Sequence, residues 1–236
     1  MLYNKIRNKV DKLKQNFKSK KNPLSIRGNI ELSDKQFKIS EKAFKPRVIH
    51  KGIEYSSYYQ IEIDRLPKSV IALIVKYWSR IEKSLGDEGV LRSATLYRII
   101  HVPKEIRNTE IFSDAWHRDT IGVTNAQIFI LLHDTNEKNG SMRYIKSESM
   151  KDVTKKYPSL KNPDKRSVDF NINNKYVSYF NGKRGDYLIL NTYCNFHSAT
   201  NPYKGYKRDM ISIAFEPKKS TKWPKVYDFN SLQKLL

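Results

Sequence analysis

The clearest helical pattern in the chain lies between residues 67 and 85. Its apolar positions recur every three or four residues, at Val70, Ile74, Trp78, Ile81 and Leu85. That spacing places them on one face of a helix, and Pro67 stands where a helix tolerates proline, at its start. We therefore expect an amphipathic helix that braces a sheet from outside and has no chemical role.

Patterns typical of strands occupy much of the rest of the chain. They cover residues 91–101, 125–133, 176–180, 185–190 and 208–215. Within 125–133 the row Ala126, Ile128, Ile130 and Leu132 alternates with the row Gln127, Phe129, Leu131 and His133. Alternate residues of a strand point to opposite faces. We expect one row to pack under helices and the other to line a pocket, with Gln127 and Phe129 as candidates.

The segments between these patterns are rich in turn residues. Gly185-Asp186 resembles a turn that opens a strand, and Asn181-Gly182 is a hairpin turn signal. Residues 22–50 are expected to be an irregular or partly extended connection, and the lysine-rich residues 146–175 a long loop over the site. Several short strands separated by turns predict a mainly β protein with flanking helices, specifically a double-stranded β-helix (jelly-roll, cupin-like).

Charge divides the chain into two unequal parts. The 236 residues carry 45 Lys and Arg against 24 Asp and Glu, a net charge of 45 − 24 = +21. Residues 1–51 alone hold fifteen basic and four acidic residues, or +11. This asymmetry predicts a basic N-terminal arm over residues 1–51 and a jelly-roll domain over residues 52–236.

The arm begins with a second amphipathic pattern. Its apolar positions are Leu2, Ile6, Val10, Leu13 and Phe17, and lysines occupy much of the remainder of residues 1–21. Such a helix either lies on an anionic membrane surface or packs onto its own domain. Nucleic acid is a weaker candidate, because the arm has few arginines and lacks interleaved aromatic and glycine residues.

Cysteine content and hydropathy bear on the compartment. The single cysteine, Cys194, excludes a disulfide within the chain. The apolar run at residues 70–75 ends at Lys76 and is too short to span a membrane. The N-terminus shows no charged-then-apolar leader. We expect a cytoplasmic protein, with peripheral attachment to the inner face of a membrane if the arm binds lipid.

The candidate chemistry rests on His117, Asp119, His197 and Arg208. Two imidazoles and one carboxylate are the ligand set of a non-haem Fe(II) facial triad. On one strand, His117 and Asp119 face the same side while Arg118 points away. His197 would come from a distant strand, and a guanidinium at position 208 can clamp a carboxylate with two hydrogen bonds. The other histidines, His50, His101 and His133, have no such neighbours in sequence and are expected to be structural.

These residues resemble those of a known family. The His-x-Asp pair, the distal His and an Arg eleven residues later look like the 2-oxoglutarate/Fe(II)-dependent dioxygenases, in particular the phytanoyl-CoA dioxygenase-like branch. Asn139-Gly140-Ser141-Met142, Gly185-Asp186 and residues 197–202 are also similar to that branch. The resemblance covers roughly residues 91 to 217. It implies that His117, Asp119 and His197 bind Fe(II) and are catalytic, and that Arg208 binds 2-oxoglutarate, with O₂ as the oxidant.

The implied reaction is hydroxylation, with succinate and CO₂ as co-products. The sequence favours as substrate an acidic small molecule, or an acidic glycan or lipid linked to a membrane, because positive charge steers anionic partners. Two alternatives stay open at this point: a nucleic-acid oxygenase or demethylase of the same superfamily, and a basic binding protein on a catalytically inactive cupin-like scaffold. The oligomeric state is not indicated by the sequence.

Overall fold

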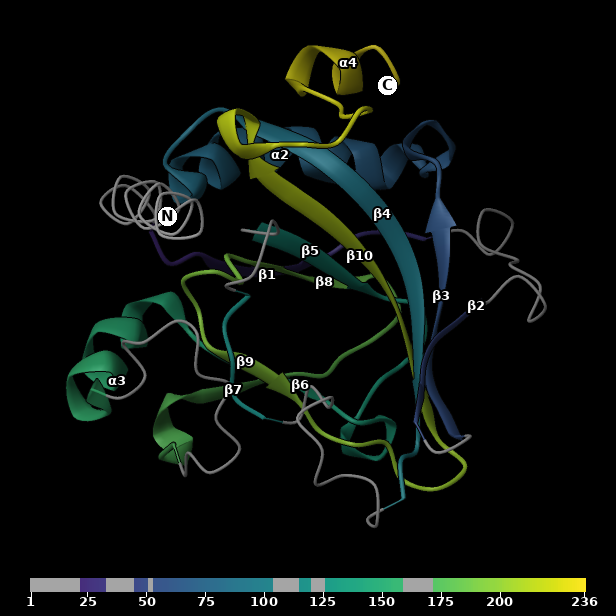
Figure 1. Cartoon of the computed structure of the whole chain (residues 1–236), viewed down its shortest axis with the longest axis vertical. Coiled ribbons are helices and arrows are strands. Elements are labelled where there is room, and N and C mark those ends of the chain that lie inside the picture. The colour runs from purple at the N-terminus through teal and green to yellow at the C-terminus, as the bar shows by residue number, and fades with distance from the viewer. Residues whose placement is uncertain (1–21, 33–44, 51–52, 104–114, 120–125, 159–171) are drawn as a thin grey trace, which may run out of the picture.

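Two antiparallel sheets form the framework of the protein. This computed structural model describes residues 22–32, 45–50, 53–103, 115–119, 126–158 and 172–236. The strands are β1 (Ser25–Asn29), β2 (Lys45–His50), β3 (Ile53–Ile61), β4 (Gly89–Ile100), β5 (Ala126–Leu131), β6 (Met142–Ile145), β7 (Val177–Phe180), β8 (Asp186–Leu190), β9 (His197–Ala199) and β10 (Lys207–Pro217). The larger sheet has the order β1-β8-β5-β10-β4-β3-β2, and the smaller β7-β6-β9 (Figure 1). The helices α2 (Lys68–Leu85), α3 (Met150–Lys156) and α4 (Phe229–Gln233) flank them.

Strand β10 runs through the middle of the larger sheet, between β5 and β4. Its residues alternate strictly between two environments. Ile211, Ile213 and Phe215 belong to the core cluster that includes α2, whereas Met210 belongs to a separate cluster with residues of the smaller sheet. The face of β10 that carries Met210 also carries the even-numbered residues from Arg208 to Ala214. We call it the inner face.

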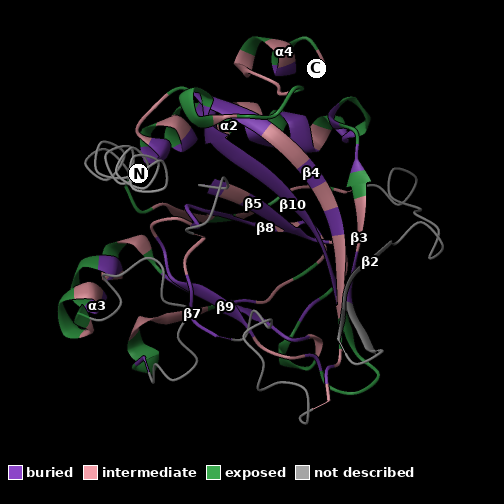
Figure 2. Ribbon diagram, in the orientation of Figure 1, coloured by how far each residue is buried: buried purple, intermediate pink, exposed green. Residues whose placement is uncertain are grey.

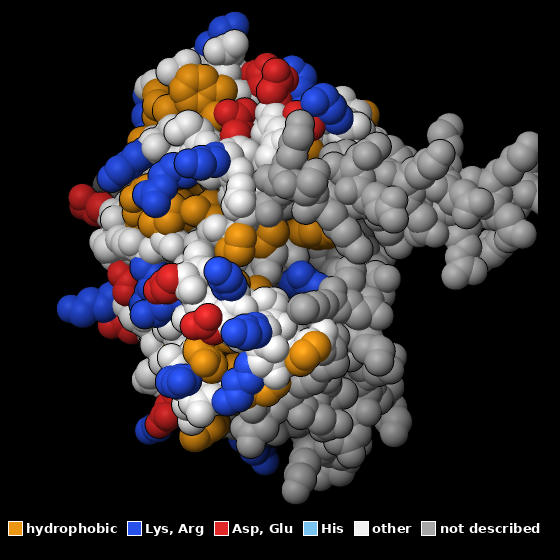
Figure 3. All heavy atoms as spheres, turned by 90° about the vertical axis from the view of Figure 1, so that its left-hand side faces the viewer, with side chains coloured by type: hydrophobic (Ala, Val, Ile, Leu, Met, Phe, Trp, Pro, Cys, Tyr) orange, Lys and Arg blue, Asp and Glu red, His pale blue; other side chains and the backbone are white. Residues whose placement is uncertain are grey.

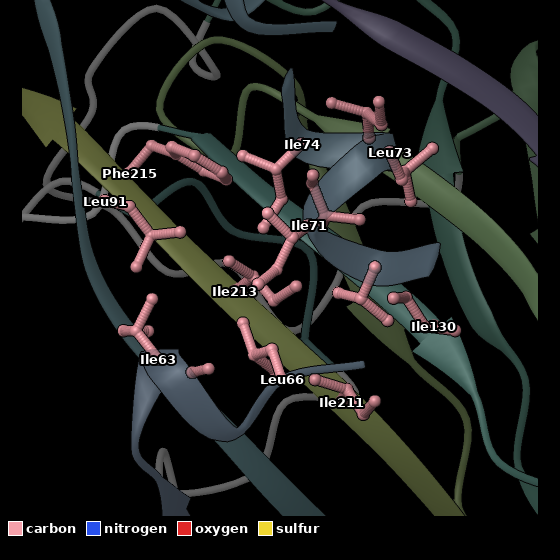
Figure 4. Packing of buried hydrophobic residues seen from close by; sticks show 14 of the residues in the cluster. Ile63, Leu66, Ile71, Leu73, Ile74, Leu91, Ile130, Ile211, Ile213 and Phe215 are labelled. Carbon is pink, nitrogen blue, oxygen red and sulfur yellow. The ribbon is translucent and has the colours of Figure 1, made fainter. Parts of the chain in front are cut away.

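Helix α2 covers the opposite, outer face of the larger sheet. It begins directly after Pro67 and ends at Gly86, whose φ of 70° lets its N–H bond back to the carbonyl of Glu82. The buried face of α2 packs against β10, and Figure 4 shows Ile71 and Ile74 lying toward Ile213. Trp78 packs against the rings of Phe215 and of Phe229 in α4.

A second cluster fills the space between the two sheets. Phe129 and Leu131 of β5, with Leu188 and Leu190 of β8, face residues of the smaller sheet. The smaller sheet contributes Met142, Tyr144 and Phe180. Figure 2 shows the buried residues concentrated in β5, β8 and β10. The two rows predicted in residues 125–133 are therefore confirmed, with Ala126, Ile128 and Ile130 outside and Gln127 and Phe129 inside.

The helix predicted over residues 67–85 is confirmed, as are the strands predicted over 91–101, 125–133, 176–180, 185–190 and 208–215, within two residues at each end. Gly185 opens β8 with a φ of 86°. The expected hairpin at Asn181-Gly182 is wrong, because β7 and β8 belong to different sheets and the chain turns between them to cross over. Gly182 instead pairs with Thr135.

Two expected loops contain regular structure. Residues 146–175 include α3, which forms because Met150 and Val153, three residues apart, are buried beside Phe196. Within residues 22–50, the described residues include two strands, in agreement with the expectation of a partly extended connection: β1 pairs with β8, and β2 with β3. The amphipathic pattern of residues 1–21 lies outside the described residues, and the division at residue 51 stays a prediction.

None of the helices in the described ranges has both the length and the apolar character that crossing a membrane requires.

The contact between α2 and the sheet predicts a large effect of truncating Ile74, which has no exposed surface. Ile74→Ala should lower the free energy of unfolding by about 2–5 kcal/mol, because it removes buried apolar surface and leaves a cavity. Denaturant unfolding followed by circular dichroism measures this change. Ser79→Ala, an exposed position on the same helix, is the control and should stay within about 0.5 kcal/mol. Equal stability of the two variants would contradict the packing described.

Candidate metal centre

His117, Asp119 and His197 converge between the two sheets. Each offers one donor atom, and these atoms all lie within 4.8 Å of one another. Asp119 Oδ1 is 3.9 Å from His117 Nε2 and 3.8 Å from His197 Nε2. The two imidazole rings lie 4.3 Å apart, centroid to centroid. The structure thus brings together the three residues that the sequence singled out as ligands.

Backbone pairing holds the three residues in place. His117 and His197 each donate an N–H to the other's carbonyl at 3.0 Å, which forms an isolated antiparallel bridge. The N–H of Asp119 bonds to the carbonyl of Thr192 at 2.9 Å. His117 and Asp119 therefore share one side although they do not lie in a long strand. Arg118 points away, with its guanidinium 4.9 Å from the ring of Phe196.

Hydrogen bonds to the backbone select the imidazole nitrogens that face the centre. Nδ1 of His117 lies 2.8 Å from the carbonyl of Ala115, and Nδ1 of His197 lies 3.2 Å from that of Asn195. A carbonyl oxygen only accepts, so both Nδ1 atoms carry the proton when the rings are neutral. The lone pair then lies on Nε2 of each ring, which is the atom directed at Asp119. This arrangement is the usual support for histidines that bind a metal.

The carboxylate of Asp119 is oriented by a glutamine and a serine. Gln127 Nε2 donates to Asp119 Oδ2 at 3.0 Å, and Gln127 Oε1 accepts from the hydroxyl of Ser212 at 2.6 Å. Oδ1 is left facing both imidazoles. The geometry therefore favours a carboxylate that binds through one oxygen only.

The donor set and spacing fit an octahedral metal such as Fe(II). Ligands about 2.1 Å from one metal, at right angles to each other, lie about 3 Å apart. Asp119 has to approach the rings by less than about 1 Å to reach that spacing, and the widest separation in the group, up to 4.8 Å, has to shorten by up to about 2 Å. It is also the most exposed of the three side chains, at 27% against 10% for His117 and 9% for His197.

Arg208 lies on the inner face of β10, the same face as Ser212. Its side chain is buried, and its Nε has no hydrogen-bond partner among the described residues. Burial lowers the pKa of Arg208 to about 10, an effect that Tyr97 opposes, so the guanidinium stays charged at neutral pH. A buried cation without an anion is costly. This unsatisfied donor fits the carboxylate of a bound dicarboxylate.

The turn at Asn139-Gly140 supports Arg208. Gly140 accepts a hydrogen bond from Nη1 of Arg208, and Asn139 Nδ2 donates to the carbonyl of Lys207 at 2.9 Å. Gly140 has a φ of 78°, and a Cβ here would lie 2.5 Å from the carbonyl oxygen of Thr200. Only glycine fits this position, which gives a physical role to the Asn-Gly motif noted in the sequence.

The remaining sequence candidates lie away from the centre. Nδ1 of His101 pairs with the carbonyl of Pro202, and Nε2 of His133 accepts from the N–H of Asp209. Both are structural, as expected. The side chain of His50 lies outside the described residues. Cys194 is half-buried and is not part of the cluster formed by the three donor residues.

Sequence reasoning missed Ser212, although a signal for it existed. In the predicted strand over residues 208–215, Ser212 is a polar residue two positions from Met210 and four from Arg208. A polar side chain on the face opposite Ile211 and Ile213 indicates a polar neighbour across the sheet. That neighbour is Gln127.

The Gln127–Asp119 hydrogen bond yields a prediction about metal affinity. Gln127→Leu should weaken binding of Co(II) or Fe(II) by about 10- to 100-fold, because the carboxylate loses the partner that orients it. Anaerobic metal titration followed by absorbance or calorimetry measures this. Gln60→Leu, which removes a glutamine that bonds only to the backbone of Ala94 and to Thr95, is the control. Unchanged affinity in Gln127→Leu would remove the orienting role.

Comparison with known proteins identifies the fold. No protein family model matches the sequence, and no curated protein matches it significantly. Among solved structures, the non-heme alpha-ketoglutarate-dependent epimerase SnoN from nogalamycin biosynthesis is similar with a TM-score of 0.51 and 12% identity, over 82% of this chain and 78% of that one. The corresponding carbocyclase SnoK is similar with a TM-score of 0.50 and 11% identity, over 86% of this chain and 82% of that one. At such identities the likeness concerns the fold. The predicted double-stranded β-helix is thus confirmed, and the chain has the fold of the Fe(II)/2-oxoglutarate-dependent oxygenases.

Proposed function

We propose that this protein is an Fe(II)- and 2-oxoglutarate-dependent oxygenase. The observation that carries the proposal is the convergence of Nε2 of His117, Nε2 of His197 and Oδ1 of Asp119 within 4.8 Å. In both histidines, Nδ1 is hydrogen-bonded to a backbone carbonyl. A purely structural His–Asp pair would require neither a second imidazole nor a buried arginine. Arg208 is buried on the inner face of β10, and its Nε has no hydrogen-bond partner among the described residues. Placement in the phytanoyl-CoA dioxygenase-like branch rests on motifs alone.

Each residue has a defined task in this reaction. His117, Asp119 and His197 would hold Fe(II) on one face and leave the opposite face open. With 2-oxoglutarate and O₂, the metal supplies the oxidising chemistry, and the protein supplies orientation and exclusion of water. Gln127 and Ser212 hold the carboxylate of Asp119. Arg208 would pair with the distal carboxylate of 2-oxoglutarate, an anion that no carboxylate of the described residues provides to its buried guanidinium.

Arg208 lies on the same face of β10 as the residues that orient the metal ligand Asp119. Ser212, which is linked to Asp119 through Gln127, is four residues from Arg208, or about 13 Å along the strand. This shared face supports a role for Arg208 in binding the co-substrate.

For the substrate we propose a chemical class and no individual compound. SnoN and SnoK belong by their names to the biosynthesis of a small molecule, and we propose a small molecule or a glycan- or lipid-linked group here, of acidic character because the net charge is +21. On the face shown in Figure 3, Lys and Arg side chains are interspersed with Asp, Glu and hydrophobic side chains. This mixed pattern favours a small substrate over the continuous basic surface that binds nucleic acid.

The decisive test is spectroscopic. Anaerobic addition of Fe(II) and then 2-oxoglutarate to the full chain should give a visible metal-to-ligand charge-transfer band. Asp119→Ala and His197→Ala should abolish the band because each removes a donor atom. A folded wild-type protein without the band would contradict the proposal and favour the alternative of a binding protein on an inactive scaffold.

Arg208 provides a separate prediction. Arg208→Lys should raise the dissociation constant of 2-oxoglutarate by about tenfold or more, since a point charge replaces a two-pronged donor. The charge-transfer band, titrated with 2-oxoglutarate at fixed Fe(II), measures the constant. Arg98→Lys is the matched control: Arg98 lies on the neighbouring strand and forms a two-bond salt bridge with Asp209. The assignment would be wrong if the two variants bound 2-oxoglutarate equally well.

A further inference from the structure

Arg92 and Glu216 carry opposite charges that attract each other, and both have buried polar atoms without a hydrogen bond of normal geometry in the described part of the protein. Glu216, near the end of β10, has no exposed surface, and the side chain of Thr221 lies close enough to lower its pKa. Arg92, on β4, is half-buried, and its Nε is buried without a partner. Buried polar atoms nearly always have partners. Three such atoms on two neighbouring strands therefore indicate a partner that the described residues do not supply.

A β-bulge directs Arg92 to the inner side of the sheet. In the β4–β10 pairing, Ser93 lies opposite Ala214 and Leu91 lies opposite Phe215, so Arg92 is the extra residue. Leu91 packs in the core under α2. An inserted residue breaks the regular alternation and changes the direction of a side chain, and such bulges are frequent beside active sites.

Glu216 lies on the inner face of β10 beyond Ser212, on the side away from Arg208, and Arg92 lies on the neighbouring strand. Along the inner face of β10, Arg208 and Glu216 are each four residues from Ser212, in opposite directions. That separation is about 13 Å of strand each way. The charges of both Glu216 and Asp119 act on Arg92 and raise its pKa, although burial, the larger effect, lowers it. Arg92 is therefore close enough to Glu216 and to Asp119 for their charges to interact.

The surroundings indicate what the pair binds. Burial raises the pKa of Glu216, and the Thr221 hydroxyl and Arg92 act against this shift. Because the positive charge of Arg92 and the negative charge of Glu216 cancel, the pair has no net charge that would attract an ionic group. It presents a hydrogen-bond acceptor, Glu216, beside a hydrogen-bond donor, Arg92. The guanidinium also lies 5.2 Å from the ring of Trp223, which is half-exposed and presents an apolar surface.

We propose that Arg92, Glu216 and Trp223 form a substrate subsite that binds neighbouring hydroxyl groups of a saccharide ring. A hydroxyl both donates and accepts, so one can donate to Glu216 while its neighbour accepts from Arg92. The apolar face of the sugar ring packs on the exposed part of Trp223. The proposal rests on the proposed function, because the saccharide would be part of the substrate of that oxygenase. A saccharide with acidic substituents also agrees with the net charge of +21.

The test uses two probes with full-length protein carrying Zn(II), which is diamagnetic, in place of Fe(II), and 2-oxoglutarate. Methyl β-D-glucopyranoside carries neighbouring hydroxyls, and tetrahydropyran-2-methanol has the same ring without them. Saturation-transfer NMR should detect binding of the glycoside and not of the second compound. Arg92→Met and Glu216→Gln should each weaken glycoside binding by about tenfold, because each removes a charged hydrogen-bonding group.

Two further variants control for folding. Glu216 is buried, so Trp223→Ala tests the same subsite from an exposed position and should also weaken glycoside binding several-fold. Arg80→Met, an exposed arginine on α2, should bind the glycoside as the wild type does. Thermal melting accompanies each measurement.

The possible results separate the two proposals. Absence of glycoside binding to the wild-type protein, or equal binding by folded Arg92→Met and Trp223→Ala variants, would overturn the subsite. In that case Arg92 and Glu216 form a structural pair. Absence of the charge-transfer band in the Fe(II) protein would contradict the proposed function. The NMR measurement does not depend on oxidation, so it would still show whether the subsite binds the glycoside.

Discussion

The alternation of side chains along β10 is the constraint on which both the core and the candidate centre depend. The same strand contributes Ile211, Ile213 and Phe215 to the packing under α2 and turns Arg208 and Ser212 to the opposite side. A slip of one residue in its register would exchange the two sets. Pairing with β4 on one edge and β5 on the other prevents this slip.

The charged residues on the inner face of β10 reduce the stability of the protein. Arg208 and Glu216 are buried with atoms that lack hydrogen bonds, and buried unpaired charges lower the free energy of unfolding. The outer face offsets this with a wide apolar contact, in which Ile211, Ile213 and Phe215 pack under α2. Stability and chemistry are thus divided between the two faces of a single sheet, as in proteins that keep strained or unsatisfied groups at functional sites.

Much of the fold could be predicted because local pattern and tertiary contact agree. The apolar stripe of residues 67–85 and the alternation of residues 125–133 have the same buried faces in the structure as in the sequence. The centre was found from residue types and order, since few arrangements use two imidazoles, a carboxylate and a distal arginine in this way. The link from Ser212 through Gln127 to Asp119 required knowledge of which strands are neighbours.

Other features depend on contacts that sequence patterns do not contain. Strand β1 forms because β8 provides an edge for it, and α3 forms because Met150 and Val153 meet Phe196. The bulge at Arg92 arises from the mismatch between two paired strands. Neither strand shows it alone.

The bulge also bears on how such a protein can diversify. It separates the inner face of β10 into a stretch up to Ala214, whose register with β4 is regular, and a short stretch beyond it that carries Glu216. Insertions or deletions before the bulge would disrupt Arg208 and Ser212 together. Changes at Arg92, Glu216 or Trp223 would leave that register intact. The last few residues of this strand can therefore change while the candidate metal centre and its register stay as they are.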